Sequence, residues 1–170
     1  MSEQAAPAAL AEQAGQLRTI YDNFTQSVQD LGNKAKGRAG GRKLGNSFLH
    51  WIGGGHVRTD RERLCEEFLE QVEGRLTLFQ AALAEAPPEE AAQACGLVAD
   101  VMLEPVSVRS NSTTDLMKRA MVSRFQPFLP YLTQEKARWC YERMKAAYKP
   151  REMLPVEKTL FQELERLVQN

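Results

Sequence analysis

The side chains best suited to bind a charged ligand lie in one glycine-rich window of this chain. Eight of the eleven glycines fall between Leu31 and Thr59, together with six Lys or Arg residues and no Asp or Glu. Cations on a mobile backbone can follow the phosphates of a nucleic acid, and an aromatic ring beside them can stack on a base. The candidate polyanion-binding residues are Lys34, Lys36, Arg38, Arg42, Lys43 and Trp51, with Phe48 close by.

Two other interpretations of this basic segment imply different chemistry. It can be a solvated loop whose charges balance the acidic first half of the helix expected after it. A phosphate-binding nucleotide loop is rejected, because Arg42 replaces the second glycine of the GxxxxGK[ST] motif and Leu44 replaces its Ser or Thr. A predicted helix, and not a strand, also precedes the segment. Polyanion binding and a solvated loop remain as the alternatives for residues 34–43.

His50, His56 and Cys65 are the residues from which a metal site or a Cys–His nucleophile would have to be built. The two histidines are the only ones in the chain, and their spacing of six does not place both rings on one helical face. Cys65 lies on a predicted apolar stripe, where a thiol usually acts as a small buried hydrophobe. We therefore expect no metal, no cofactor and no catalytic cysteine.

The acidic and hydroxyl side chains form no catalytic constellation either. Glu66, Glu67, Glu70 and Glu73 make a charged helical face and lack the Glu-x-x-His pairs of di-iron bundles. No GxSxG turn surrounds a serine. The sequence therefore favours a protein without enzymatic activity.

The C-terminal third offers a second candidate cationic surface. Some of its basic residues fall opposite the apolar stripe of one predicted helix, and the others lie just before that helix. The alternative is that the last two cations of this helix complement its dipole. The residues concerned are Lys118, Arg119, Arg124, Arg138, Lys145 and Lys149.

The elements that must position these residues are helices, beginning with a long one near the N-terminus. Apolar residues recur from Leu10 to Leu31 in steps of four and three, which predicts about six helical turns with one buried seam. We interpret the seam as packing within the chain; the alternative is a coiled coil between chains. Gly32 is expected to end this helix. The seam consists of Leu10, Ala14, Leu17, Tyr21, Phe24, Val28 and Leu31.

Turn and cap residues divide the rest of the chain into further helices. Thr59 and Glu62 form a capping box that opens a second helix, running to about Ala86. Two prolines at 87–88 end it and begin a third helix, which must stop near Pro105. A short fourth helix is expected to place one apolar stripe in the core. The members of that stripe are Leu116, Met117, Ala120, Met121 and Phe125.

Two more helices are predicted after a turn bracketed by Pro127 and Pro130. Thr133 caps the fifth helix, which Pro150 ends, and Pro155 opens the last. No run of alternating apolar and polar residues indicates a strand. The predicted fold class is all-α: a single bundle of five to six helices at 10–170, with a flexible N-terminus at 1–9 and a basic glycine-rich connector at 32–58.

Charge is segregated along the chain although 22 basic and 22 acidic residues balance overall. The net charge is −3 over 1–30, +6 over 31–59, −8 over 60–104 and +5 over 105–170. Three widely spaced cysteines, no secretory signal and no apolar stretch of membrane-spanning length indicate a cytoplasmic protein. We expect a non-catalytic interaction or regulatory protein with a protein partner or as a homodimer. The alternative is a nucleic-acid or other polyanion-binding module that uses residues 34–43.

Overall fold

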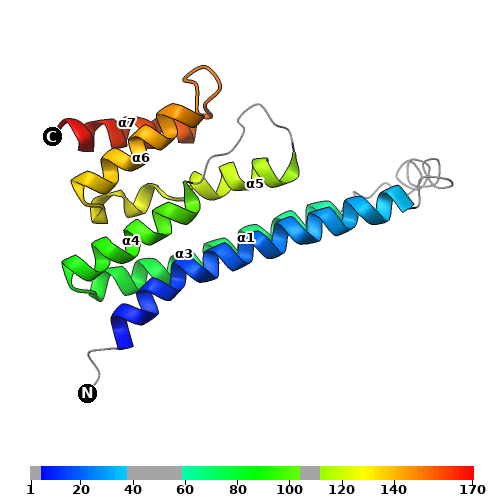
Figure 1. Cartoon of the computed structure of the whole chain (residues 1–170), viewed down its shortest axis with the longest axis horizontal. Coiled ribbons are helices and arrows are strands. Elements are labelled where there is room, and N and C mark those ends of the chain that lie inside the picture. The colour runs from blue at the N-terminus through cyan, green and yellow to red at the C-terminus, as the bar shows by residue number, and fades with distance from the viewer. Residues whose placement is uncertain (1–4, 38–58, 104–111) are drawn as a thin grey trace, which may run out of the picture.

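The computed structural model describes residues 5–37, 59–103 and 112–170, and every regular element in these ranges is a helix. The all-α class is therefore confirmed for these residues, and none of them forms a strand. Figure 1 shows a long pair of helices along one side and shorter helices stacked beside it. In chain order the helices are α1 (Ala5–Gly37), α3 (Asp60–Glu85), α4 (Pro88–Met102), α5 (Thr113–Val122), the 3-10 helix η1 (Gln126–Tyr131), α6 (Gln134–Ala147) and α7 (Pro155–Gln169).

Helix α1 packs along α3 and α4 through the apolar seam expected from the sequence. Leu10, Ala14, Leu17 and Phe24 are buried, and the other seam residues are partly buried. The ring of Phe24 stacks on that of Phe68 in α3, with 4.5 Å between centroids. The steps of four and three therefore identify the buried face of α1, and that face is covered by helices of the same chain.

Helix α1 does not end at Gly32, as the sequence had indicated, but continues to Gly37. A single glycine costs a helix only about 1 kcal/mol relative to Ala, and the Lys and Ala residues that follow it are good helix formers. A Cβ added at Gly32 would meet no atom within 4 Å, so packing does not require glycine there. The remainder of the expected connector, and its apolar stretch at 48–52, lies outside the described residues.

The start of α3 is set by the capping box that the sequence predicts. The Thr59 side-chain oxygen accepts a hydrogen bond from the Glu62 backbone N–H at 3.1 Å, and the Glu62 carboxylate accepts one from the Thr59 N–H at 2.9 Å. Thr133 caps α6 in the same way, at 3.1 Å from the Lys136 N–H. These caps satisfy backbone donors that a helix start leaves unpaired.

The C-terminal helices α6 and α7 form an antiparallel pair that packs mainly on itself (Figure 1). The rings of Tyr141 in α6 and Phe161 in α7 stack at 4.9 Å. Helix η1 joins this pair to the N-terminal helices, because the Phe128 ring lies 5.5 Å from that of Phe79 in α3. The backbone carbonyl of Phe128 also accepts a hydrogen bond from the Cys95 thiol of α4, at 3.3 Å.

The expected apolar stripe of α5 is confirmed in part, since Met121 and Phe125 are buried and Met117 packs against the core, but the buried face also includes two charged residues. Lys118 and Arg119 are buried, at 2% and 7% exposure, whereas Leu116 is 43% exposed. The Lys118 ammonium donates a hydrogen bond to the Val101 carbonyl at 2.6 Å and lies 4.4 Å from the centroid of the Tyr21 ring. Charged residues therefore occupy positions on α5 that the apolar pattern had assigned to solvent.

Candidate functional site

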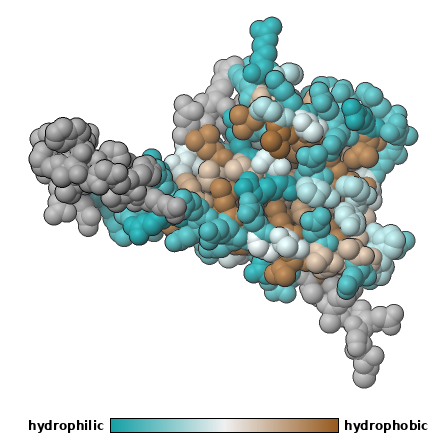
Figure 2. All heavy atoms as spheres, turned by 180° about the vertical axis from the view of Figure 1, so that it is seen from behind, coloured by the Kyte–Doolittle hydropathy of each residue, from teal (hydrophilic) through white to brown (hydrophobic). Residues whose placement is uncertain are grey.

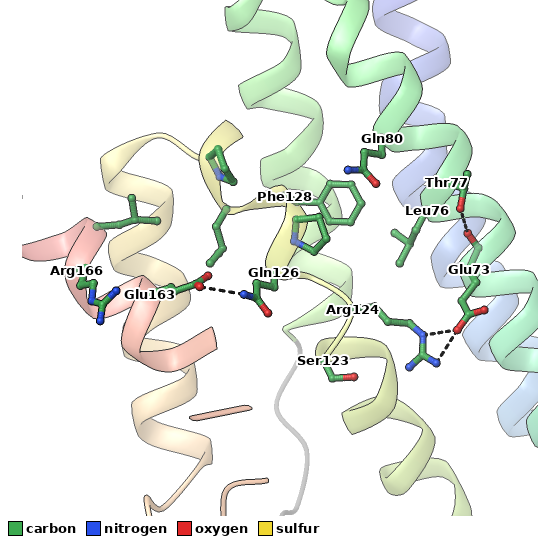
Figure 3. A pocket seen from close by; sticks show the side chains of 14 residues that line it. Glu73, Leu76, Thr77, Gln80, Ser123, Arg124, Gln126, Phe128, Glu163 and Arg166 are labelled. Carbon is green, nitrogen blue, oxygen red and sulfur yellow. Dashed lines mark hydrogen bonds and ion pairs between the residues drawn. The ribbon is translucent and has the colours of Figure 1, made fainter. Parts of the chain in front are cut away.

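A groove with a volume of about 890 Å³ lies between α3, η1 and α7. One wall is the face of α3 from Glu73 to Gln80, and the other is the C-terminal half of α7. The segment Pro127–Pro130 forms the floor together with Leu76, and Ser123, Arg124 and Gln126 lie at its edge (Figure 3). This volume falls in the range of sites that hold a ligand or a segment of another chain.

The floor of this groove is apolar. Its residues are Leu76 of α3 and the η1 segment Pro127, Phe128, Leu129 and Pro130. Phe128 and Leu129 are buried, whereas both prolines are exposed. A proline has no N–H donor, so these two positions present hydrocarbon to the groove without an unpaired donor. The surface is therefore suited to apolar side chains from a partner.

The rim of the groove is polar, and most of its groups are held by partners within the protein. The Arg124 guanidinium donates two hydrogen bonds to one carboxylate oxygen of Glu73, at 2.7 and 3.0 Å. The Gln126 amide donates to the Glu163 carboxylate at 2.9 Å, which ties η1 to α7. Figure 3 shows these contacts on opposite walls. The rim is thus a fixed frame around the apolar floor.

Arg166 is the basic residue of this rim that lacks an ion pair among the described residues. Its side chain is exposed on α7, and it forms no ion pair with any of the residues that the structure describes. Leu167, its neighbour along the chain, is partly buried and also lines the groove. The α7 wall therefore offers one unpaired cation beside one apolar side chain.

A buried ion pair fixes the start of α7, and with it this wall of the groove. The Arg119 guanidinium donates to both oxygens of the Glu157 carboxylate, each at 2.7 Å, and also to the Glu152 carbonyl at 3.0 Å. Glu157 is fully buried and accepts a further hydrogen bond from the Leu154 N–H at 2.7 Å. The hydrogen bond to Glu157 raises the pKa of Arg119, so the guanidinium is charged at every accessible pH.

The cysteines are not activated for nucleophilic chemistry. Burial raises the pKa of both Cys95 and Cys140 to about 12. Desolvation also raises the pKa of Cys65, although Arg61 opposes that effect. A thiol with a raised pKa is neutral at pH 7, and the thiolate is the reactive form. The raised pKa of Cys65 therefore does not support a Cys–His nucleophile. The possible partners His50 and His56 lie outside the described residues.

The structure describes only part of the proposed polyanion-binding segment. Lys34 is exposed on α1 and borders a hollow of about 310 Å³ together with Asp30, Asp60 and Glu67. Arg63 also lines this hollow and pairs with Asp60, so Lys34 lies near charges of both signs. Lys36 belongs to α1. Arg38, Arg42, Lys43 and Trp51 lie outside the residues described.

The second cationic surface expected in the C-terminal third does not form as a unit. Lys118 and Arg119 are buried, and Arg124 is paired with Glu73. Arg138, Lys145 and Lys149 are exposed on or just after α6. The candidate surface therefore lacks Lys118 and Arg119, because both of these side chains find partners in the interior.

The groove itself was not identified from the sequence, although one signal for it was present. Pro127 and Pro130 bracket two large apolar residues, and this pattern had been interpreted only as a turn. An apolar turn with two prolines cannot extend a neighbouring helix, so it leaves a gap between the helices on either side. No sequence pattern indicated that α7 would form the other wall of the groove.

Comparison with known proteins adds no further guide to this site. No protein-family model, curated protein or solved structure matches the chain. Within residues 5–37, 59–103 and 112–170, no cluster of His, Cys, Asp and Glu is arranged to hold a metal ion. In the same ranges, none of the helices combines the length and the apolar character needed to cross a membrane.

Proposed function

We propose that this protein is a non-catalytic binding protein whose groove between α3, η1 and α7 takes an amphipathic helix of a protein partner. The observation that carries the proposal is the apolar floor of η1 and Leu76, open between two helical walls and framed by polar residues. Helical partners commonly bind in this way, with apolar side chains in the groove and polar ones at its edge.

The size of the groove supports a helical occupant. An α-helix of about 10 Å diameter and two turns in length occupies on the order of 850 Å³, close to the 890 Å³ of the groove. The α3 wall spans Glu73 to Gln80, which is also about two turns. An inserted helix would contact both walls at once and would cover the exposed prolines.

The chemistry of the lining residues supports binding rather than turnover. Four polar lining residues are engaged in two separate pairs, Arg124 with Glu73 and Gln126 with Glu163. Catalytic groups more often have a free face toward the substrate. The free cysteines also suit a reducing compartment, and we propose that the protein acts in the cytoplasm.

Site-specific photo-cross-linking in cells tests this function. A photo-reactive amino acid at Gln80, which is exposed and lines the groove, should give one discrete protein adduct. The matched control is Leu78, which is 62% exposed on the same helix but outside the groove. No adduct from position 80, or the same adducts from both positions, would contradict the proposal.

The alternative function, polyanion binding by residues 34–43, rests on a different part of the molecule. Helix α1 continues to Gly37 and carries exposed Lys34 and then Lys36 toward its C-terminal end. Figure 2 shows mostly hydrophilic surface on the described part of the molecule near this end of α1, whereas apolar patches gather over the body of the molecule. This arrangement favours contacts that are electrostatic and not apolar.

A mobility-shift assay separates this alternative from the first proposal. Binding to nucleic acid should weaken steeply as the salt concentration rises, because phosphate contacts release counterions. Replacing the five cations of residues 34–43 by Ala should remove most of the shift. An absent shift at low salt, or an unchanged one in this variant, would reject polyanion binding.

A further inference from the structure

We infer that the helix bound in the groove is α7 of a second copy of this chain, so that two copies form a symmetric dimer. The inference rests on the proposed function above and names its partner. In such a dimer, the α7 helices lie antiparallel, and each one fills the groove of the other copy. A two-fold interface requires a surface that is complementary to itself.

The charges on the groove edge of α7 are self-complementary. Glu163 and Arg166 are one turn apart on this edge, and both line the groove. When two α7 helices lie antiparallel about a point between these residues, Glu163 of each copy faces Arg166 of the other. The two-fold symmetry therefore produces two ion pairs, because each copy contributes one acidic and one basic side chain.

Neither side chain has an opposite charge as its partner within the described chain. Arg166 forms no ion pair there, and the contact of Glu163 is the uncharged amide of Gln126. By contrast, Glu73 and Arg124 on the α3 side already neutralise each other. The charges left for a partner are thus one positive and one negative, both on α7.

The apolar part of the interface fits the same arrangement. Leu167 follows Arg166 and would lie against the η1 prolines of the second copy. The neighbouring face of α7 stays in its own core, because Leu160 and Leu164 are fully buried there and Leu167 packs partly against the same core. The dimer therefore uses the accessible edge of α7 beside this buried face, and no unfolding of the helix is needed.

Sedimentation equilibrium of the full chain over a wide concentration range tests this inference by charge exchange. The wild type should form a dimer. Glu163→Arg and Arg166→Glu should each weaken dimerisation about tenfold or more, because each change places like charges opposite each other in both symmetry-related pairs. The double exchange, Glu163→Arg with Arg166→Glu, should restore most of the affinity.

A matched control and the cross-linking experiment separate the possible outcomes. Lys158→Glu changes an exposed charge on α7 outside the groove and should leave dimerisation unchanged. A double exchange as weak as the single variants would overturn the inference. If the wild type is monomeric and position 80 cross-links to another protein, the dimer inference is overturned. The proposed function would still hold in that case. A monomer without any adduct would overturn both.

Discussion

Different interactions stabilise the two halves of this molecule. Helices α1, α3 and α4 pack through apolar side chains, among which Leu17, Val72 and Phe79 are fully buried. The C-terminal half is fastened to α5 by the Arg119–Glu157 pair, which is also buried. Apolar contact depends on the amount of surface removed from water, whereas a buried pair depends on the geometry of both partners.

The difference indicates how the groove keeps its shape. Its α3 wall belongs to the apolar half, and its α7 wall belongs to the half that the ion pair fixes. Helices α6 and α7 pack mainly on each other, and this pair is linked to the rest of the molecule by Arg119–Glu157, by η1 and by the ion pair between Lys136 of α6 and Asp100 of α4. Because Arg119–Glu157 and η1 contact α7 itself, we expect both to influence the width of the groove.

The largest expected effect comes from removing the buried carboxylate. Glu157→Ala should lower the free energy of unfolding by about 3–5 kcal/mol, because it leaves the Arg119 guanidinium buried without its partner. Urea denaturation followed by circular dichroism measures this loss. The matched control replaces both charges, Arg119→Met with Glu157→Leu, and should be destabilised far less. Equal losses for the single and double variants would show that the pair does not fasten the two halves.

A cavity in the apolar half should cost slightly less. Leu17 is fully buried on α1 between α3 and α4, so Leu17→Ala should lower the free energy of unfolding by about 3 kcal/mol. The same denaturation experiment applies. The control Leu78→Ala removes an exposed leucine of α3 and should change stability by less than about 0.5 kcal/mol. Similar losses at both positions would contradict the assignment of the seam.

Alkaline pH should weaken the packing of α4 and α6 through the buried thiol that each helix carries. The pKa of Cys95 and Cys140 is about 12 in the folded protein, above the value of 9.0 for a free thiol. The folded state therefore favours the neutral thiol, and its contribution is complete below pH 9 and is lost as the pH rises from 9 toward 12. At pH 10 the loss should be about 1 kcal/mol for each thiol. Denaturation midpoints measured from pH 7 to 10 check this, and Cys95→Ala should flatten the decline.

The smallest effect is expected at a helix cap. Thr59→Ala removes the oxygen that accepts the Glu62 N–H and should cost about 1 kcal/mol. Thr59→Ser keeps that oxygen and serves as the control. Amide hydrogen exchange of the first turn of α3 should rise in the Ala variant only. A rise in both variants would assign the effect to the lost methyl group and not to the cap.

The sequence predicted the apolar half well because its signals are local. The spacing of Leu10, Ala14 and Leu17 identifies one helical face, and the capping box of Thr59 and Glu62 fixes the start of the next helix. Both depend on residues within two turns of each other. The end of α1 was misplaced because a single glycine was given more weight than the favourable helix propensity of the residues after it.

The C-terminal half could not be predicted in the same way. Arg119 and Glu157 are 38 positions apart, and a periodicity argument places charged residues in solvent unless it knows their partners. Leu116 was assigned to the core for the same reason and is exposed. The groove depends on how these helices are arranged in space. Only its η1 floor was indicated in the sequence, by the two prolines of that segment.

Hydroxyl-radical footprinting of the unmodified protein tests most directly whether the groove is an interface between copies. The oxidation of Leu167 and the η1 prolines is compared between dilute and concentrated protein, with exposed Leu78 and Leu97 as internal controls. We predict that oxidation in the groove falls as the concentration rises while both control leucines react equally throughout. Unchanged oxidation in the groove, or protection at Leu78 and Leu97 instead, would contradict the account.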